Sequence, residues 1–220
     1  MTAVPHDRRV LLVGATGLVG GHLLDGLLAD PTVAELHALV RRPLSVSHPK
    51  LRTHALHLPN VPVLPALDEA YLALGTTLAV AGSREAFRAV DLWGNQAVAE
   101  AACRAGVRRI GVVSAAGAHP QSRVFYSQVK GALEEALRSM DLDGLVIARP
   151  SLLLGDRGPL GQPPRRAERM AMPLARWLAP YTPVAYRPVH ARSVARALLA
   201  TVPQACGVVE LSSGVMAAAY

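Results

Sequence analysis

The stretch RRVLLVGATGLVGGHLLDGLLAD, residues 8–30, contains two patterns that together predict the fold of the chain. Residues 8–14 are a short run rich in Val and Leu, which is typical of a strand buried on both faces. Residues 18–30 carry apolar side chains at helical spacing, and Pro31 ends that helix. A buried strand that leads through a tight turn into a helix is the first unit of an α/β fold with a parallel sheet.

The rest of the chain repeats this alternation of strands and helices. Further strands are expected at residues 33–40, 51–58, 70–75, 107–114 and 144–150. Long helices are expected at 83–105 and 122–140, and the Pro-rich segment 59–65 is expected to be a loop. The alternation predicts a doubly wound parallel sheet with helices on both faces. Ligands bind such sheets beyond the carboxyl ends of the strands, so the residues that directly follow each strand are candidates for a site.

Three glycines follow the first strand, in the stretch GATGLVG (14–20). Gly14 permits a tight turn, Gly17 lets the backbone approach a pyrophosphate, and Gly20 lets the helix pack close to the strand. The helix N-terminus adds free N–H donors and the positive end of the helix dipole. The spacing is GxxGxxG rather than GxGxxG, but its position at the first strand–helix turn predicts a dinucleotide site. The residues expected to bind the nucleotide there are Gly14, Thr16, Gly17, Leu18, Val19 and Gly20.

The residues after the second strand indicate which dinucleotide fits the site. A site for NAD(H) places Asp or Glu there, and the carboxylate accepts hydrogen bonds from the ribose hydroxyls. This chain has Arg41 and Arg42 instead, and guanidinium groups pair with phosphate in a bidentate manner. We therefore expect NADP(H), with its 2′-phosphate, rather than NAD(H). The alternative is that the two arginines form a solvated basic turn.

A tyrosine and a lysine lie four residues apart in FYSQVKGALEEAL (125–137). Tyr126 and Lys130 therefore share one helix face, with Cβ atoms about 6 Å apart. An ammonium about 4 Å from a phenolate stabilises it by roughly 4 kcal/mol at an effective dielectric constant of about 20. The pair is thus a candidate for proton exchange near neutral pH. Ser114, at the end of a strand and 12 residues upstream of Tyr126, is expected to meet the tyrosine over the nicotinamide ring.

Together, these motifs resemble those of the short-chain dehydrogenase/reductase family. The resemblance covers about residues 8–155, and its motifs are GATGLVG (14–20), LALGTT (72–77), VVSAAGA (112–118), YSQVK (126–130) and ARPSLLLGDR (148–157). Each motif alone is weak, but their combination and order are specific. Within the family, the chain looks closest to the atypical, short branch of Tat-interacting-protein-like oxidoreductases. The resemblance implies a Rossmann-type NAD(P)-binding fold.

The resemblance also implies a role for each matching residue. Tyr126 would donate or accept the proton, Lys130 would favour the phenolate and bind the nicotinamide ribose, and Ser114 would hydrogen-bond the reacting oxygen of the substrate. Arg149 would lie outside the chemistry. The chain departs from the family where a second hydroxyl often follows the first, because Ala115 stands there. Further cofactor contacts implied by the resemblance are Leu74, Gly75, Thr76, Thr77, Lys130, Pro150, Ser151, Leu152 and Leu153.

Length and composition predict one domain. Residues 1–220 suit a single Rossmann-type domain, in which about residues 151–220 form a small C-terminal region on the substrate side. This region is too short for a large substrate lobe, so we expect a small-molecule substrate. The two cysteines make no disulfide framework, and no Cys/His cluster has the spacing of a metal site.

Charge and hydropathy indicate the partners and the compartment. The net charge of +7 favours either a phosphorylated ligand or nucleic acid. Nucleic acid is the less favoured partner, because the basic residues are dispersed and no aromatic residues alternate with them. No apolar run is long enough to span a bilayer, and the first residues lack the pattern of a signal peptide, so we expect a cytoplasmic protein without a membrane partner. A monomer and a homodimer through the two long helices are both open.

Two functions follow from these observations. The first is an NADP(H)-dependent oxidoreductase of the short-chain dehydrogenase/reductase type. In it, a small carbonyl or alcohol substrate exchanges a hydride with the cofactor and a proton with Tyr126. The second is an NADP(H)-binding regulatory or redox-sensing protein with little turnover. The combination of Ser114, Tyr126 and Lys130 favours the enzyme, because a sensor has no chemical need of it.

Overall fold

The main sheet of the protein is parallel throughout. The computed structural model describes residues 7–155 and 187–219. The strands of the main sheet are β1 (Arg8–Val13), β2 (Val33–Val40), β3 (Leu51–Ala55), β4 (Glu69–Leu72), β5 (Arg109–Val113), β6 (Gly144–Arg149) and β9 (Gly207–Ser212). They lie in the order β3-β2-β1-β4-β5-β6-β9. The chain builds β1 to β3 towards one edge and then returns past β1 to build β4 onwards towards the other. The point where the strand order reverses therefore lies between β1 and β4.

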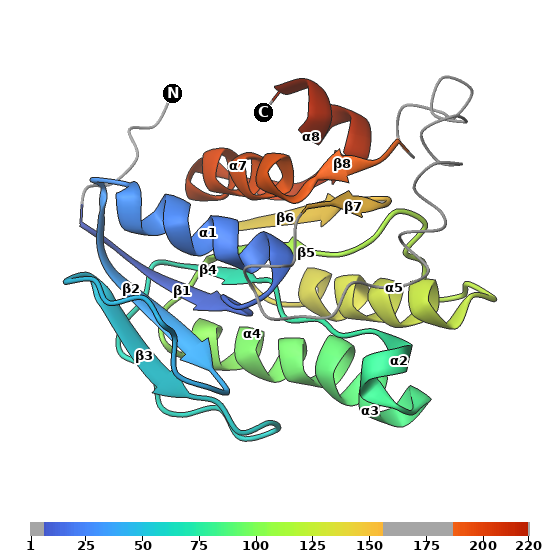
Figure 1. Ribbon diagram of the computed structural model, residues 1–220, viewed down its shortest axis with the longest axis horizontal. Helices are drawn as coiled ribbons and strands as arrows, with labels where there is room; N and C mark the ends of the chain where they lie inside the picture. The colour runs from blue at the N-terminus through green and yellow to red at the C-terminus, as the bar shows by residue number, and fades with distance from the viewer. Residues whose placement is uncertain (1–6, 156–186, 220) are drawn as a thin grey trace.

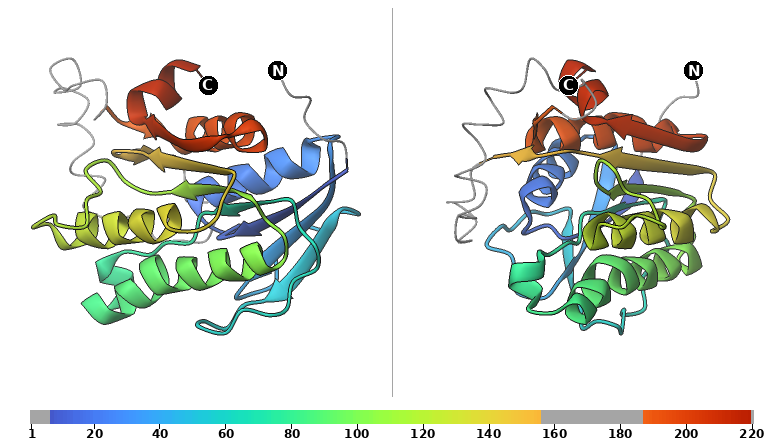
Figure 2. Two further views of the ribbon diagram at one scale, coloured as in Figure 1. Left: turned by 180° about the vertical axis from the view of Figure 1, so that it is seen from behind. Right: turned by 90° about the vertical axis from the view of Figure 1, so that its right-hand side faces the viewer.

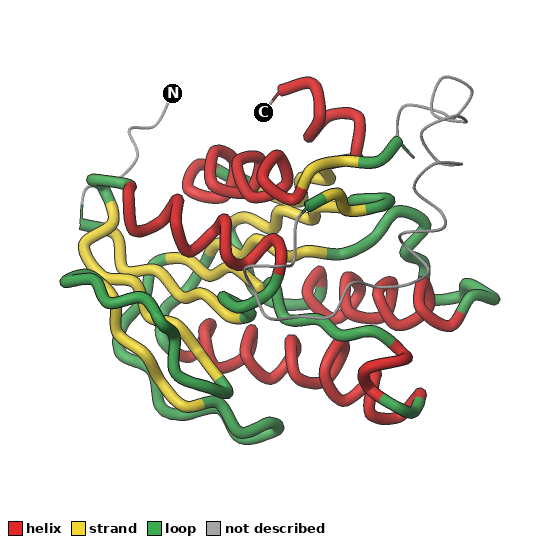
Figure 3. Tube along the Cα trace, viewed as in Figure 1, coloured by secondary structure: helices red, strands yellow, loops and turns green. Residues whose placement is uncertain are grey.

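Helices cover both faces of the sheet, as Figures 1 and 2 show. The long helices of the described residues are α1 (Leu18–Ala29), α4 (Asn95–Arg104), α5 (Phe125–Arg138) and α7 (Ala191–Thr201). α1 and α7 lie on one face, and α4 and α5 lie on the other. Figure 3 shows the same layers, with yellow strands between red helices. Each helix layer buries its own apolar core against the sheet, one around Leu23 and the other around Leu133. The predicted Rossmann-type α/β fold is confirmed.

The helix predicted at 83–105 is confirmed as a continuous helical run from Arg84 to Arg104. It consists of α3 (Arg84–Arg88), a π-helical segment (Ala89–Gly94) and α4. Ser83 caps its start, where the serine hydroxyl accepts the Ala86 N–H, which has no partner inside the helix. A short helix that the sequence does not predict, α2 (Leu78–Ala81), precedes it. Thr77 caps the start of α2 by accepting the Val80 N–H, and Gly82 ends α2 with a left-handed φ of 81°.

Several strands are shorter than the sequence predicts, most of all β3, β4 and β5. β3 ends at Ala55 rather than at residue 58, β4 ends at Leu72 rather than at residue 75, and β5 covers Arg109–Val113 rather than 107–114. Residues 73–75 follow β4 and line the cavities described below. Their apolar character therefore reflects a loop at the carboxyl edge that buries Leu74, rather than a longer strand.

The described part of the C-terminal region joins the main sheet and its helices. β9 pairs with β6, and α7 packs against α1. The remaining elements are β7 (Leu153–Leu154), β8 (Val189–His190), a 3₁₀ helix (Val202–Gln204) and α8 (Ser213–Ala219). Residues 156–186 lie outside the described residues, so the substrate-side region expected at about 151–220 stays a prediction. Within residues 7–155 and 187–219, no helix combines the length and hydropathy needed to cross a membrane.

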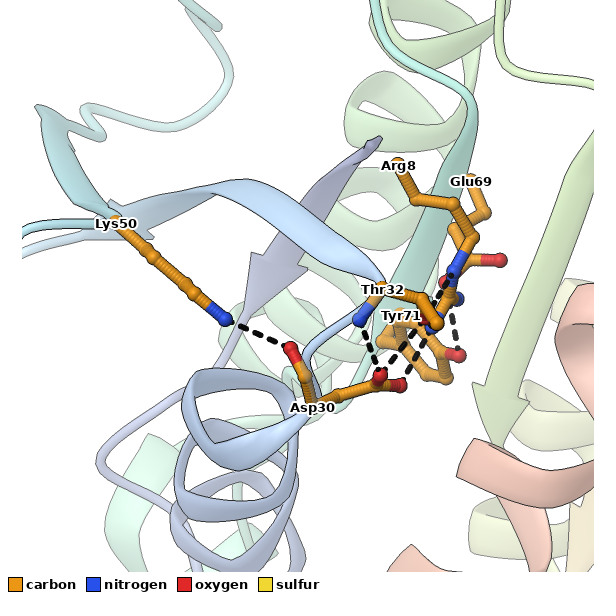
Figure 4. Close-up of polar contacts among 6 residues, drawn as sticks. All are labelled: Arg8, Asp30, Thr32, Lys50, Glu69 and Tyr71. Carbon is orange, nitrogen blue, oxygen red and sulfur yellow. Dashed lines mark hydrogen bonds and ion pairs between the residues drawn. The ribbon is translucent and has the colours of Figure 1, made fainter. Parts of the chain in front are cut away.

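A buried polar network joins the amino ends of the central strands (Figure 4). Arg8, at the start of β1, pairs with the carboxylate of Glu69 on β4, and its Nη2 lies 2.6 Å from Asp30 Oδ2. The same Nη2 donates to Thr32 Oγ1 over 2.8 Å, and the Tyr71 hydroxyl donates to Glu69 over 3.2 Å. Burial raises the pKa of Glu69 to about 7, although the Arg8 charge acts against this rise. This network fixes β1 against β4 at the edge opposite the glycine turn.

Candidate functional site

The glycine turn after β1 has the geometry that the sequence predicts. Gly14 has a φ of 85°, and a Cβ there would lie 2.3 Å from the Ala73 carbonyl oxygen. A Cβ on Gly20 would lie 2.0 Å from the Gly14 carbonyl oxygen, so α1 packs this close to the turn only with glycine. The Gly17 N–H donates to the Gly14 carbonyl over 2.8 Å and closes the turn. The N-terminus of α1 therefore opens onto the carboxyl edge of the sheet with free N–H donors.

Two neighbouring cavities lie at this edge of the sheet. The smaller one, of about 80 Å³, lies over the ends of β1 and β2. Its lining includes the glycine turn together with Arg41 and Arg42, whose side chains are exposed. The residues that line both cavities are Gly17, Ala73, Leu74 and Gly75. The two cavities therefore meet at the glycine turn, where the pyrophosphate of a bound dinucleotide would lie in this fold.

The larger cavity, of about 380 Å³, extends from the start of α1 to α5. Ser114, Tyr126 and Lys130 all line it, although Ser114 directly follows β5 and the other two lie on α5. The other predicted residues that line it are Gly17, Leu18, Val19, Leu74, Gly75, Thr76, Thr77, Pro150, Ser151, Leu152 and Leu153. Of all the residues predicted for catalysis or cofactor binding, Gly20 alone lines neither cavity, and it supports the glycine turn from behind.

Lys130 is held by a carboxylate that the sequence analysis did not predict. Its Nζ lies 2.9 Å from Asp91 Oδ1 and 3.4 Å from the Val113 carbonyl oxygen. Both side chains are buried, with 4% of Lys130 and 0% of Asp91 exposed. Burial acts to lower the pKa of Lys130, but the Asp91 charge, the hydrogen bond to Asp91 and the interactions with Tyr126 and Glu134 together outweigh it, so the pKa lies above its ordinary value. Lys130 therefore faces the cavity as half of an ion pair rather than as a lone ammonium.

Asp91 itself is fixed from two directions. Its Oδ2 accepts the Thr76 N–H over 2.8 Å, which ties it to the loop after β4. It lies in the π-helical segment, a rare conformation that is frequent at functional sites. Asn95 completes this arrangement, because its side-chain amide donates to the carbonyl oxygens of Leu74, Val90 and Asp91. Asn95 therefore holds the helix against the cavity loop.

The Ser114 hydroxyl points to a second unpredicted carboxylate. Ser114 Oγ forms a short hydrogen bond with Glu134 Oε1, one helical turn beyond Lys130 on α5. Arg149, at the end of β6, binds the same carboxylate through two hydrogen bonds. Its Nε lies 3.0 Å from Oε1, and its Nη2 lies 2.5 Å from Oε2. Arg149 also pairs with Glu210 on β9 at 2.5 Å. The hydroxyl expected to hydrogen-bond the substrate is thus already engaged within the protein.

Tyr126 is the most accessible of the three predicted catalytic residues. Its side chain is 39% exposed, whereas Ser114 is 3% exposed. Its ring leans against the buried ring of Phe87, with centroids 5.8 Å apart and planes tilted by 53°. The aromatic contact fixes the phenol at the mouth of the larger cavity. A ligand can therefore reach Tyr126 from solvent while Lys130 supports it from within.

Asp91 and Glu134, which the sequence does not identify as site residues, have one feature in common. Each is an acidic residue on a helix that packs against the sheet, and a buried carboxylate there requires a partner. Asp91 lies 39 positions before Lys130, and Glu134 lies 20 positions after Ser114. Helical spacing indicates which face of α5 is buried, but it does not identify partners on another element. The structure alone decides these pairs.

The parallel sheet, its reversal of strand order and the glycine turn define a Rossmann-type dinucleotide-binding protein. Residues 14–172 match the model of a family described as NAD(P)H-binding. The chain therefore belongs to the NAD(P)H-binding family. Its ligand is accordingly a small molecule, and the family alone does not distinguish NADP(H) from NAD(H).

Relatives and solved structures extend this assignment. The chain is 36% identical over 164 residues to "Protein FMP52, mitochondrial" of Coccidioides immitis, a match that covers 66% of each protein. The structure resembles MoeE5 in complex with UDP-glucuronic acid and NAD, with a TM-score of 0.69, 20% identity and coverage of 93% of this chain and 76% of that one. It also resembles a short-chain dehydrogenase/reductase superfamily protein from Agrobacterium tumefaciens with bound NAD, with a TM-score of 0.66, 18% identity and coverage of 93% and 77%. At these identities, the two structures show a common fold alone.

The comparisons correct one expectation drawn from the sequence. The cytoplasmic assignment is wrong by this criterion, because relatives from Coccidioides immitis, Aspergillus terreus and Saccharomyces cerevisiae are all named mitochondrial proteins. The expectation rested on the lack of a secretory signal pattern, which has no bearing on mitochondrial targeting. The Tat-interacting-protein-like branch is not among these relatives' names, and that finer assignment stays a prediction.

Proposed function

We propose that the protein is an NADP(H)-dependent oxidoreductase that acts on a small carbonyl or alcohol substrate. The cofactor supplies or accepts the hydride, and Tyr126 exchanges the proton with the substrate oxygen. Lys130 supports the phenol and the nicotinamide ribose, with its charge held in place by Asp91. Ser114 lines the same cavity. The chain's own task is to position the reactants and to move one proton.

One observation carries this proposal: Tyr126 and Lys130 line the cavity that begins at the glycine turn. A dinucleotide whose pyrophosphate lies at the N-terminus of α1 would extend its nicotinamide half along that cavity. The exposed phenol then lies at the cavity mouth, where a substrate enters. Proximity of the phenol and the hydride donor is the requirement for coupled hydride and proton transfer.

The choice of NADP(H) is supported by Arg41 and Arg42. Both line the smaller cavity directly after β2, where the adenosine ribose of a dinucleotide lies in this fold. Both side chains are exposed, so they can reach a 2′-phosphate without a desolvation cost. Among the described residues that line this cavity there is no carboxylate, which would accept from a free 2′-hydroxyl.

The test combines binding with turnover. NADPH binding is followed by fluorescence, and NADPH oxidation by absorbance over a panel of aldehydes and ketones. We expect the wild-type protein to bind and to oxidise NADPH, and Tyr126→Phe to bind it equally well with turnover lowered at least a hundredfold. Tyr71→Phe is the matched control, because this buried phenol lies in the network of Figure 4, and its turnover should be unchanged. Equal turnover of Tyr126→Phe and wild type would refute the assigned role.

A second function, an NADP(H)-binding regulatory or redox-sensing protein with little turnover, is favoured by one observation. The Ser114 hydroxyl is engaged with Glu134, and Ala115 follows it, so no free hydroxyl stands there to polarise a substrate carbonyl. In that case NADPH would bind with the same preference, but no carbonyl would be reduced at a measurable rate. The panel above separates the two functions directly.

A further inference from the structure

The direction of the hydrogen bond between Ser114 and Glu134 follows from the other partners of the carboxylate. Arg149 donates Nε–H to Oε1 and Nη2–H to Oε2 of Glu134. Arginine has donors alone and keeps its proton at every accessible pH, so the bidentate contact requires an ionised carboxylate. An ionised carboxylate accepts hydrogen bonds and donates none. Ser114 must therefore donate its single O–H proton to Glu134.

This direction decides what Ser114 offers to the cavity. A hydroxyl has one donor and two acceptor lone pairs, and the donor is used. Among the described residues, no other group bonds to Ser114 Oγ, and the residue lines the larger cavity. The oxygen therefore presents lone pairs to any ligand placed there. A ligand carbonyl placed opposite Ser114 would bring two acceptors together. The carbonyl oxygen would then be desolvated without a hydrogen-bond donor, which is unfavourable.

We propose that Ser114 is a hydrogen-bond acceptor for the bound ligand, and that Glu134, held by Arg149, is the positioning residue that makes it so. The ligand group opposite Ser114 is then an O–H or N–H donor rather than a carbonyl oxygen. This inference adds a role for Ser114 to the proposed function, and it rests on that proposed function for the identity of the cofactor. Of the two hydroxyl groups of Ser114 and Tyr126, it leaves that of Tyr126 to donate to the reacting oxygen. Two sources fit this chemistry: the carboxamide N–H of the nicotinamide, or a hydroxyl of the substrate beside its reacting carbon.

The surroundings of Glu134 keep this arrangement fixed. Glu134 is 3% exposed and lies on the buried face of α5, so water does not compete for its oxygens. Glu210 on β9 pairs with Arg149 and also with Arg138, each at 2.5 Å, and so anchors the arginine from the far side. Four elements, β5, α5, β6 and β9, thus contribute to the orientation of one hydroxyl. Such a satisfied polar network has a single low-energy arrangement.

The test measures a preference rather than activity alone. Binding of NADP⁺ and of its 3-acetylpyridine analogue, which lacks the carboxamide N–H, is compared by calorimetry. In a second arm, KM is compared for matched carbonyl substrates with and without a neighbouring hydroxyl. We expect the wild type to favour the donor-bearing member by about three- to tenfold in one of the two arms, which identifies the source of the donor.

Two variants test the role of the carboxylate. Glu134→Gln can turn its amide N–H towards Ser114 and its carbonyl towards Arg149, which frees the serine proton. We therefore expect it to reverse the preference, whereas Ser114→Ala should abolish it. Glu100→Gln is the matched control, because Glu100 is exposed on α4 and accepts from Gln96 over 3.0 Å. Thermal unfolding of each variant establishes that it folds, and Ser114→Ala carries the test if Glu134→Gln does not.

The outcomes separate this inference from the proposed function. If the wild type binds NADP⁺ but neither arm shows a preference for the donor, or if both variants keep the wild-type preference, the inference is overturned and the proposed function stands. If the wild type binds neither dinucleotide, the proposed function fails and the inference fails with it. A preference in binding without any turnover supports the inference and favours the sensor over the enzyme.

Discussion

The pair of Asp91 and Lys130 gives the sharpest prediction, for the variant Asp91→Asn. The substitution removes the carboxylate charge 2.9 Å from Lys130 Nζ but keeps an oxygen that can accept the Thr76 N–H. At this distance and an effective dielectric constant of about 20, the lost attraction is about 6 kcal/mol. Removing one partner of a buried ion pair costs about 3–5 kcal/mol in practice, because the remaining charge is partly relieved by relaxation. We therefore expect a loss of about 3–5 kcal/mol in the free energy of unfolding.

Urea unfolding followed by circular dichroism measures this loss at pH 7. Asp141→Asn is the control, because Asp141 pairs with Arg108 on the exposed surface, and its effect should be too small to resolve. The double variant Asp91→Asn/Lys130→Met removes both charges and should recover much of the stability of the wild type. An Asp91→Asn protein within about 0.5 kcal/mol of the wild type would refute the reasoning, as would a double variant no more stable than the single one.

The pH dependence gives an independent check on the same pair. In the wild type, the folded-state pKa of Lys130 lies above its ordinary value of 10.5. Its stabilisation is therefore complete below about pH 10 and is lost as the pH rises through the folded-state value. In Asp91→Asn, the unpaired buried ammonium favours the neutral amine, so the variant gains stability relative to the wild type as the pH rises from 7 to 10. A difference between the two proteins that widens over this range would contradict the assigned pairing.

Three further predictions concern the cofactor site and the opposite edge of the sheet. Replacing Arg41 and Arg42 by Ala should weaken NADPH binding about tenfold or more, because charge-assisted contacts to the 2′-phosphate are lost. NADH binding, measured in the same fluorescence titrations, should be unchanged. Equal losses of affinity for both dinucleotides would contradict the assigned contact. Gly20→Ala places a Cβ 2.0 Å from a backbone oxygen. It should therefore lower the free energy of unfolding in urea by about 1–3 kcal/mol and weaken nucleotide binding. An unchanged unfolding midpoint would contradict this close approach. The folded-state pKa of Glu69, about 7, lies above its ordinary value of 4.5, so the folded protein binds more protons than the unfolded chain between these two pH values. The free energy of unfolding should therefore fall by up to about 3 kcal/mol as the pH rises from about 4.5 to about 7. Glu69→Gln should remove this slope in unfolding experiments at pH 5 and pH 8, and an unchanged slope would assign it to another group.

Much of the fold follows from local patterns in the sequence. The run of Val and Leu before the glycines places β1, and helical spacing after them places α1, because burial and periodicity act on neighbouring residues. The helix predicted at 83–105 is confirmed as the run from Arg84 to Arg104, and Ser83 caps its start. The predicted site residues in the loops after the strands line the two cavities at one edge of the sheet, because parallel strands end at the same edge.

The sequence by itself determined the parallel sheet, the glycine turn and the presence of Tyr126 and Lys130 on one helix face, since each depends on spacing along a single element. Only the tertiary structure decided that Asp91 pairs with Lys130 and that Glu134 accepts the hydrogen bond of the Ser114 hydroxyl. These pairings join residues on different elements, so they depend on how the helices cross the sheet. The role of a hydroxyl as donor or acceptor, in turn, depends on which other groups its partner already binds.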